Sequence, residues 1–447
     1  MEQEVVPREA LRARDLLILL ISVASLVCVL WNLQDASIKN ANTGSRYATV
    51  ESLVDYGTFA IDQSLYRRTI DKVKLDDHYY SSKPPVLPVY AAGVYWVYHR
   101  ITGDTFASAE GNCVRFCGLM SGWLSHLLLL LYLYRLSKLL FTRQLAIVGL
   151  ALLGGFAYLG AGYATTLNNH SVAATLALIG FYYAVRIRRG STPHPRHWLL
   201  SGLCLGFLPT IDVPSGVISA AVFGYLYTFD RKKTLTWFLP ALLPGPLTHA
   251  LLSYLSTGSV IPVYLRRSLY DYPGSYWNRE SGIDALREPK HIYGFHVLFG
   301  HHGLFSMTPV FAFAVFELYR AIRQRLQLKA EAWLVASASA VLVVFYIFYS
   351  HNYGGWCVGM RWFVPIMPLL CIFCAVWLDR VVLSRLQLWL FAAAFAVSAF
   401  HVQDAMDGPF QYSVWHNWLE NQPNRGRTGK KFNLQRVEPQ GKSRRNR

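Results

Sequence analysis

The chain has 447 residues, of which 53% are hydrophobic, 15% charged and 15% aromatic, and its mean hydropathy is positive. Such a length usually means two or three soluble domains, but apolar runs near 20 residues recur from end to end, and each can cross ~30 Å of hydrocarbon. The composition therefore excludes a soluble protein and predicts an all-α polytopic membrane protein.

The net charge of +17 at pH 7 does not indicate a nucleic-acid partner. Lys and Arg concentrate in short loops between the apolar runs, as the positive-inside rule expects, and in the C-terminal tail. The seven cysteines are scattered, and only Cys357 falls in a polar loop. They indicate neither a disulfide framework nor a thiolate metal site.

Twelve apolar segments follow one another along the chain, and the basic turns between them decide which segments cross the membrane. Segment 86–101 is short and rich in interfacial aromatics, so we expect it to lie on the outer surface. About eleven transmembrane helices then remain, with a cytoplasmic N-terminus. The segments cover residues 15–33, 86–101, 113–135, 144–163, 170–188, 197–209, 212–229, 234–256, 303–323, 331–350, 361–379 and 384–402.

This topology divides the chain into a membrane domain, residues 1–402, and a basic tail, residues 403–447, that we expect to be disordered and lipid-associated. The large external loops are 34–112 and 257–302, and the first should contain interfacial helices. Between segments 197–209 and 212–229, Pro209, Asp212 and Pro214 break the apolar run. Broken helices are tolerated where they line a cavity.

The first external loop gathers carboxylates and cations in a chain that is otherwise poor in charge. Ser45 is the expected cap of a short helix over residues 46–56, which Gly57 ends. Val50, Leu53 and Val54 would share one face of this helix, so we expect it to lie on the membrane. Asp76-Asp77-His78 is typical of a turn.

Five stretches resemble the GT-C superfamily of glycosyltransferases, most closely the bacterial relatives of the protein O-mannosyltransferases and of the transferase that adds aminoarabinose to lipid A. Their order and spacing carry the resemblance, which covers most of residues 15–380. The stretches read SRYATVESLVDYGTFAID, SSKPP, TLNNH, GHHGLFSMTP and NYGGWCVGMRWFVPIMP.

The resemblance implies a GT-C-type fold and a sugar transfer, with inversion, from a polyprenyl-phosphate donor on the non-cytoplasmic face. The enzyme would be a hexosyl- or pentosyltransferase of the cell envelope in a bacterial inner membrane, and its acceptor a glycan, lipid or protein. Relatives carry an acidic pair two residues before the Arg-Tyr of the first loop, and one of these acids is the base. Here those positions are Thr43 and Gly44.

The implied reaction needs a base for the acceptor hydroxyl and cations for the leaving phosphate. Asp71 is the favoured base and Asp35 the second choice. Lys83, Arg361 and Arg46 are the expected donor-phosphate ligands. No metal site is expected, and a divalent cation is the alternative. The residues expected to contact the sugar or the acceptor are Tyr47, Lys72, Asn169, His170, His301 and His302.

Two other functions remain open at this point. A catalytically degenerate GT-C protein that binds or scaffolds is suggested by Thr43 and Gly44, and transfer from a labelled polyprenyl-phosphate sugar would distinguish it from the enzyme. A secondary transporter would need ionisable residues within its spans, and these spans carry almost none.

Overall fold

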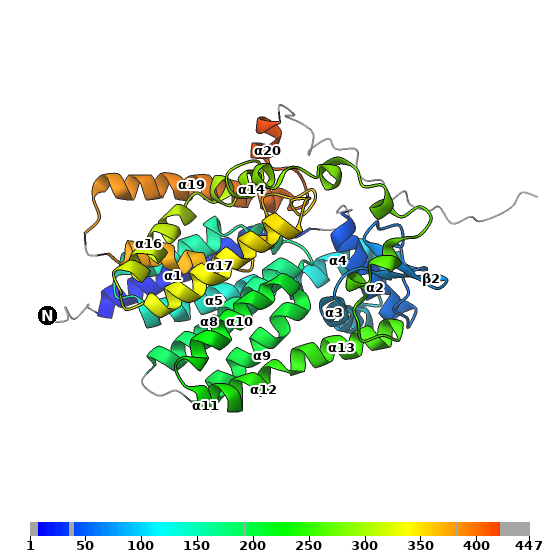
Figure 1. Cartoon of the computed structure of the whole chain (residues 1–447), viewed down its shortest axis with the longest axis horizontal. Helices are drawn as coiled ribbons and strands as arrows, with labels where there is room; N and C mark the ends of the chain where they lie inside the picture. Colours follow the sequence, from blue (N-terminus) through cyan, green and yellow to red (C-terminus); the bar gives the residue numbers. More distant parts are fainter. Residues whose placement is uncertain (1–7, 35–39, 191–193, 381, 421–447) are drawn as a thin grey trace, which may run out of the picture.

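The computed structural model describes residues 8–34, 40–190, 194–380 and 382–420. The predictions for Asp35 and for residues 421–447 of the basic tail fall outside these residues. The part of the tail that is described, 403–420, is helical over 403–407 and 414–419, so the expectation of disorder is wrong there. In Figure 1 the long helices run side by side across the molecule, and a smaller unit of α2, α3 and a β-hairpin closes one end of this bundle.

The first half of the bundle contains the helices up to residue 227. They are α1 Arg8–Trp31, α4 Phe106–Gly118, α5 Leu124–Leu140, α6 Gln144–Leu152, α7 Gly160–Tyr163, α8 Asn169–Arg189, α9 Pro195–Ile211 and α10 Gly216–Tyr227.

The second half continues after a basic turn. Its helices are α11 Arg231–Lys233, α12 Leu239–Leu242, α13 Pro244–Thr257, α14 Lys290–Leu298, α15 Leu304–Met307, α16 Phe311–Arg323, α17 Lys329–Tyr349, α18 Met367–Leu378, α19 Arg385–Asp407 and α20 Val414–Leu419.

Six helical stretches are long and apolar enough to cross a membrane, and three shorter apolar helices accompany them in the described part of the chain. All nine fall in segments predicted to span. Segments 197–209 and 303–323 form α9 and α16, of 17 and 13 residues. The helical bundle is as predicted, whereas the count of eleven spans stays a prediction. The six stretches are Arg12–Trp31, Phe106–Leu140, Asn169–Arg189, Arg231–Thr257, Lys329–Tyr349 and Arg385–Asp407.

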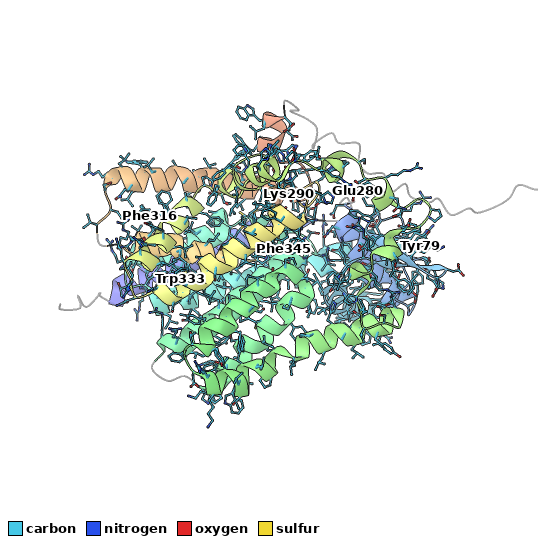
Figure 2. All side chains as sticks on the ribbon, in the orientation of Figure 1. Tyr79, Glu280, Lys290, Phe316, Trp333 and Phe345 are labelled. Carbon is cyan, nitrogen blue, oxygen red and sulfur yellow. The ribbon has the colours of Figure 1, made fainter. Side chains whose placement is uncertain are left out.

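The side chains on the outside of the bundle are those of a surface that faces lipid. Phe316, Trp333 and Phe345 are 49%, 54% and 39% exposed, and Figure 2 shows them along α16 and α17. Glu280 and Lys290 lie away from these two helices, in the loop before α14 and at its first residue. A soluble protein rarely leaves so much contiguous apolar surface uncovered. The bundle is therefore an integral membrane domain.

The basic turns meet at one end of the bundle. Lys138 pairs with Asp15 at 3.2 Å, the backbone N–H of Arg143 donates to Asp379, and Arg189 forms a 2.6 Å ion pair with Glu331. The α2–hairpin unit lies at the other end (Figure 1). The positive-inside rule predicts that the end with the basic turns is cytoplasmic.

The end unit consists of α2 Ala41–Asp55, α3 Val86–Thr102 and an antiparallel hairpin of β1 Lys72–Leu75 with β2 His78–Ser81. The two residues between the strands make the predicted turn, with Asp76 at a positive φ of 53°. Figure 1 shows α3 almost end-on while the bundle helices run across the view. An orientation across the bundle suits the interfacial position expected of segment 86–101.

The expected start of the first-loop helix is wrong. The helix begins at Ala41 rather than Arg46, because the Asn40 side chain accepts a hydrogen bond from the Thr43 backbone N–H and caps it. Ser45 instead donates to the Asp71 backbone carbonyl at 2.5 Å. Every side chain from Thr43 to Ser52 is buried, so α2 is enclosed by protein rather than lying on the membrane.

Glycine allows a close contact between helices in the bundle. A Cβ on Gly245 in the first turn of α13 would lie 2.2 Å from the Gly206 carbonyl oxygen of α9, and a Cβ on Gly206 would lie 2.2 Å from the Leu242 carbonyl oxygen. Small residues let the backbones of two membrane helices come into contact, and the helices gain dispersion energy from this contact. This contact fixes α9, whose C-terminal end reaches the site described next.

Candidate active site

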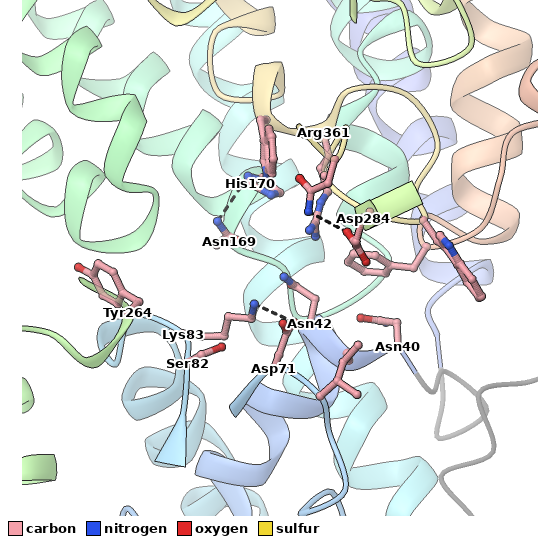
Figure 3. A pocket seen from close by; sticks show the side chains of 18 of the residues that line it. Asn40, Asn42, Asp71, Ser82, Lys83, Asn169, His170, Tyr264, Asp284 and Arg361 are labelled. Carbon is pink, nitrogen blue, oxygen red and sulfur yellow. Dashed lines mark hydrogen bonds and ion pairs between the residues drawn. The ribbon is translucent and has the colours of Figure 1, made fainter. Parts of the chain in front are cut away.

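A cavity of about 1860 Å³ lies between the bundle and the end unit. Its walls come from segments far apart in sequence: the start of α2, the hairpin, the first turn of α8, the corner after α9, the loop before α14 and the loop after α17. Figure 3 shows Asp71 and Lys83 rising from the hairpin side toward Arg361, Asn169 and His170 on the bundle side.

Arg361 is the most unusual cation in this cavity. The residue is 9% exposed, and its Nε and Nη1 atoms have no hydrogen-bond partner among the described residues. Gly354 has a positive φ of 86°, and a Cβ there would lie 3.1 Å from Arg361 Nε. Glycine therefore lets the preceding loop close over the guanidinium. A buried cation with unused donors is a site for an anionic ligand, because leaving charged donors unpaired is costly.

Arg46 presents a second cation on the same cavity. Its Nη1 donates to the Asn42 backbone and side-chain oxygens, and its Nη2 donates to Asn169 Oδ1 at 2.7 Å. Burial, together with the positive charge of Arg361, lowers the pKa of Arg46. The two guanidinium groups lie close enough to repel one another, and an anion bound between them would relieve that repulsion.

Asn169 and His170 are joined to Asp212, whose side chain sits where the apolar run breaks. Asn169 Nδ2 donates to Asp212 Oδ2 at 3.2 Å, and His170 Nδ1 lies 2.6 Å from the same oxygen. Asp212 caps the end of α9 and receives a further hydrogen bond from Ser215. The sequence indicated this residue only as an interruption, and the structure makes it the group that orients the α8 side chains.

Asp71 and Lys83 form an ion pair of 2.7 Å at the mouth of the hairpin. Burial lowers the pKa of the Lys83 ammonium, the Asp71 carboxylate opposes this effect, and Arg46 adds to it. Twelve residues separate the two side chains, and the antiparallel register of Lys72 with Ser81 brings them side by side. A carboxylate and a cation are thus held together at the wall of the cavity.

A second carboxylate faces the cavity from the loop before α14. Asp284 accepts hydrogen bonds of 2.7 Å from the Tyr276 hydroxyl and from Asn352 Nδ2. Burial raises the pKa of Asp284, and the charge of Asp71 contributes to the increase. No sequence signal set this acid apart from the other charges of its loop. The aromatic residues that line the cavity beside it are Tyr264, Tyr270, Tyr276 and Trp277.

The acid missing from Thr43 and Gly44 is not replaced on α2. Thr43 is 1% exposed. A Cβ on Gly44 would lie 3.8 Å from the Tyr66 ring. The α2 side chain that lines the cavity one turn before Arg46 is Asn42, an amide. A base in this cavity must therefore come from another element, and Asp71 and Asp284 are both available there.

Four predicted site residues lie away from the cavity lining. Tyr47 is buried and donates to the Val114 backbone carbonyl, so it packs α2 against α4. Lys72 donates to the Arg67 carbonyl and lies 4.4 Å above the Tyr79 ring. His301 and His302 are buried in a separate group of histidines. Burial lowers the pKa of His301 to about 3, so its ring is neutral at pH 7.

The predicted residues thus divide into two groups. One cavity is lined by Arg46, Asp71, Lys83, Arg361, Asn169 and His170. Tyr47, Lys72, His301 and His302 do not line it. Asp35 is outside the described residues. Chemically, the cavity combines the cations Arg46, Lys83 and Arg361 with several carboxylates, among them Asp71 and Asp284, and with aromatic rings. This combination suits an anionic ligand that also carries apolar or sugar groups.

The overall fold is similar to solved glycosyltransferases. Comparison with the structure of ArnT from Cupriavidus metallidurans bound to undecaprenyl phosphate gives a TM-score of 0.53 at 15% identity, covering 85% of this chain and 63% of that one. The apo form of the same protein gives 0.51 at 13% identity, with 87% and 75% covered. The apo oligosaccharyltransferase of Archaeoglobus fulgidus gives 0.53 at 12% identity, with 97% and 61% covered.

Both proteins are GT-C glycosyltransferases, so the chain has the GT-C fold that its motifs predicted. It spans less than two thirds of the first ArnT structure and of the oligosaccharyltransferase. No protein-family model matches the sequence, and none of the curated proteins compared is similar to it.

Proposed function

We propose that the chain is a membrane glycosyltransferase that moves a sugar from a polyprenyl-phosphate donor to an acceptor on the non-cytoplasmic face of a bacterial inner membrane. One observation carries the proposal. Arg361 holds a buried guanidinium with two nitrogens that lack partners among the described residues, in the same cavity as Arg46 and Lys83. Three converging cations at the end of a membrane bundle are a site for a lipid-borne phosphate.

The surroundings of the cations support a lipid donor rather than a free phosphate. The cavity is also lined by apolar residues at the ends of the bundle helices, among them Trp31, Leu33, Ile211 and Val213. A polyprenyl chain would leave between these helix ends toward the bilayer. A solved structure of the same fold was determined with undecaprenyl phosphate, which is why a polyprenyl phosphate is the anion we propose.

The proposed reaction is a single displacement, and Asp71 is its proposed base. The Asp71 carboxylate takes the proton of the acceptor hydroxyl, whose oxygen attacks the anomeric carbon and inverts it. The bond between that carbon and the phosphate oxygen breaks, and its electron pair leaves with the polyprenyl phosphate. Arg361, Arg46 and Lys83 stabilise the negative charge on this leaving group. The donor sugar is a hexose or a pentose, and stacking on Tyr264 and Tyr276 would orient it.

The carboxylates of Asp71 and Asp284, which line the cavity, favour an enzyme over a degenerate binding protein. Transfer of a labelled sugar from polyprenyl-phosphate sugars to envelope extracts tests this directly. Asp71→Asn keeps the size of the side chain and should abolish turnover while binding of polyprenyl phosphate persists. Asp284→Asn is the matched comparison, because it removes a second acid of the same cavity. Full turnover in the Asp71 variant with loss of turnover in the Asp284 variant would assign the base to Asp284. Full turnover in the double variant would reject both.

A further inference from the structure

Three histidines meet outside the cavity, at the junction of two loops and the last described helix. His301 and His302 follow α14, and His416 lies in α20, more than a hundred residues later. One ring nitrogen of each residue lies within 4.8 Å of a ring nitrogen of the other two. They are 3%, 0% and 8% exposed. The sequence predicts sugar or acceptor contacts for His301 and His302 and does not connect them to His416.

The rings are held in place from several directions. His302 stacks on Tyr353 with ring centroids 5.3 Å apart, and His416 stacks on Tyr412 at 4.0 Å. Trp415, beside His416, donates its indole N–H to the Gly300 carbonyl at 3.2 Å. The α20 helix is therefore fixed over the His301-His302 loop, and the three imidazoles are positioned before any ligand arrives.

Hydrogen bonding among the rings does not account for this arrangement. The Nδ1 atoms of His301 and His302 face one another at 2.5 Å, which uses one N–H and one lone pair. The other nitrogen of His302, Nε2, is buried and has no hydrogen bond of good geometry to any described residue. The Cys357 backbone lies beside this ring, where a metal-bound histidine usually donates its second N–H.

We propose that His301, His302 and His416 bind a Zn²⁺ ion. Neutral imidazole nitrogens are preferred ligands of zinc, and three of them with a water molecule complete a tetrahedral site. Zinc–nitrogen bonds of ~2.05 Å place tetrahedral ligands about 3.3 Å apart. The ring nitrogens here lie 2.5 Å apart for one pair and within 4.8 Å for all three. Binding of the ion would therefore require the Nδ1 atoms of His301 and His302 to move apart.

The ion would connect the last described helix to the loop that carries Arg361. The His302 carbonyl accepts the backbone N–H of Met360 at 3.0 Å, one residue before Arg361. The Val358 N–H donates to Pro409, between α19 and α20. Zinc thus acts as a structural link behind the cavity and takes no part in the chemistry proposed above. This inference does not depend on the identity of the donor.

The test is the zinc content of the purified full-length chain. The protein carries a tag other than polyhistidine, is treated with a chelator, exposed to micromolar zinc sulfate and desalted, and zinc is counted by plasma mass spectrometry. We expect about one zinc per chain, and a melting temperature that falls on chelation and recovers with zinc. His416→Ala and His302→Ala should lose the ion. His401→Ala is the control, since His401 is 4% exposed in α19 and outside the cluster.

Each outcome decides the assignment. Absence of zinc from the wild-type chain at saturating metal would overturn it, as would retention of zinc by a monodisperse His416→Ala protein. Loss of zinc from His401→Ala as well would mean that the ion is bound elsewhere or nonspecifically, and would also reject the site. If His302→Ala does not fold, His416→Ala still decides, because its ring is at the surface side of the cluster and remains 8% exposed.

Discussion

Removal of the Arg361 side chain is the perturbation that bears most directly on the proposed donor site. Arg361→Ala deletes a guanidinium that is 9% exposed and has two nitrogens without partners among the described residues. A hydrogen bond to a charged group contributes about 1.5–3 kcal/mol, and each 1.4 kcal/mol is a factor of ten in affinity. The Kd for polyprenyl phosphate should therefore rise roughly 10- to 150-fold.

The same substitution should not weaken the fold. Arg361 lies close enough to lower the pKa of both Arg46 and Lys83, so its removal relieves repulsion between like charges. The free energy of unfolding should stay the same or increase. Arg361→Lys keeps the charge but loses the planar fork of donors, and should give an intermediate Kd. Arg100→Ala, on the exposed face of α3 and away from the cavity lining, should change nothing.

The assay is titration of the detergent-solubilised chain with a short polyprenyl phosphate, followed by native mass spectrometry or thermophoresis, alongside a melting curve for each variant. An Arg361→Ala protein that is folded and binds with the wild-type Kd would refute the assignment of this cavity to the donor phosphate. Equal weakening in Arg100→Ala would show that the titration measures partition into detergent rather than a site.

Three further predictions concern topology, pH and packing. Thr142 is exposed in the basic turn between α5 and α6, so Thr142→Cys should react with an impermeant maleimide only after lysis; labelling of intact cells would reverse the topology. Burial raises the pKa of Glu51 to about 7, so its contribution to stability is present below about pH 4.5 and lost as the pH rises through 7. The melting temperature of the wild-type chain should therefore fall between pH 5 and 8, and that of Glu51→Gln should fall less. An equal fall in both proteins would contradict this prediction. Gly245→Ala should destabilise the fold by about 1–3 kcal/mol. Gly224→Ala should be neutral or stabilising, because a Cβ there would have nothing within 4 Å. Equal melting temperatures of the two variants would exclude the close contact between α13 and α9.

The sequence alone determined the long apolar helices of the bundle, the membrane class of the protein and its GT-C fold. In a bilayer every backbone polar group must be satisfied within its own helix, so an apolar run of sufficient length is a helix almost regardless of its neighbours. The basic turns and the break at Asp212 followed from equally local signals. The motif order predicted the GT-C fold, and Pro84-Pro85 marked the start of α3 at Val86. The start of α2 was misplaced because Asn40 and Ser45 are both acceptable caps, and burial of the whole helix decided between them.

Only the tertiary structure decided which side chains meet. Arg46 and Asn169 are 123 residues apart in sequence and 2.7 Å apart in the cavity, and the pairing depends on how α2 packs against the first turn of α8. Lys72 and Lys83 have the same side chain within one hairpin, yet only Lys83 lines the cavity. The association of His416 with His301 and His302 is likewise invisible in the spacing of the motifs. Backbone hydrogen bonds within a helix join residues close in sequence, so local patterns predict them. The convergence of distant side chains depends on packing between helices, which the sequence specifies only through the whole fold.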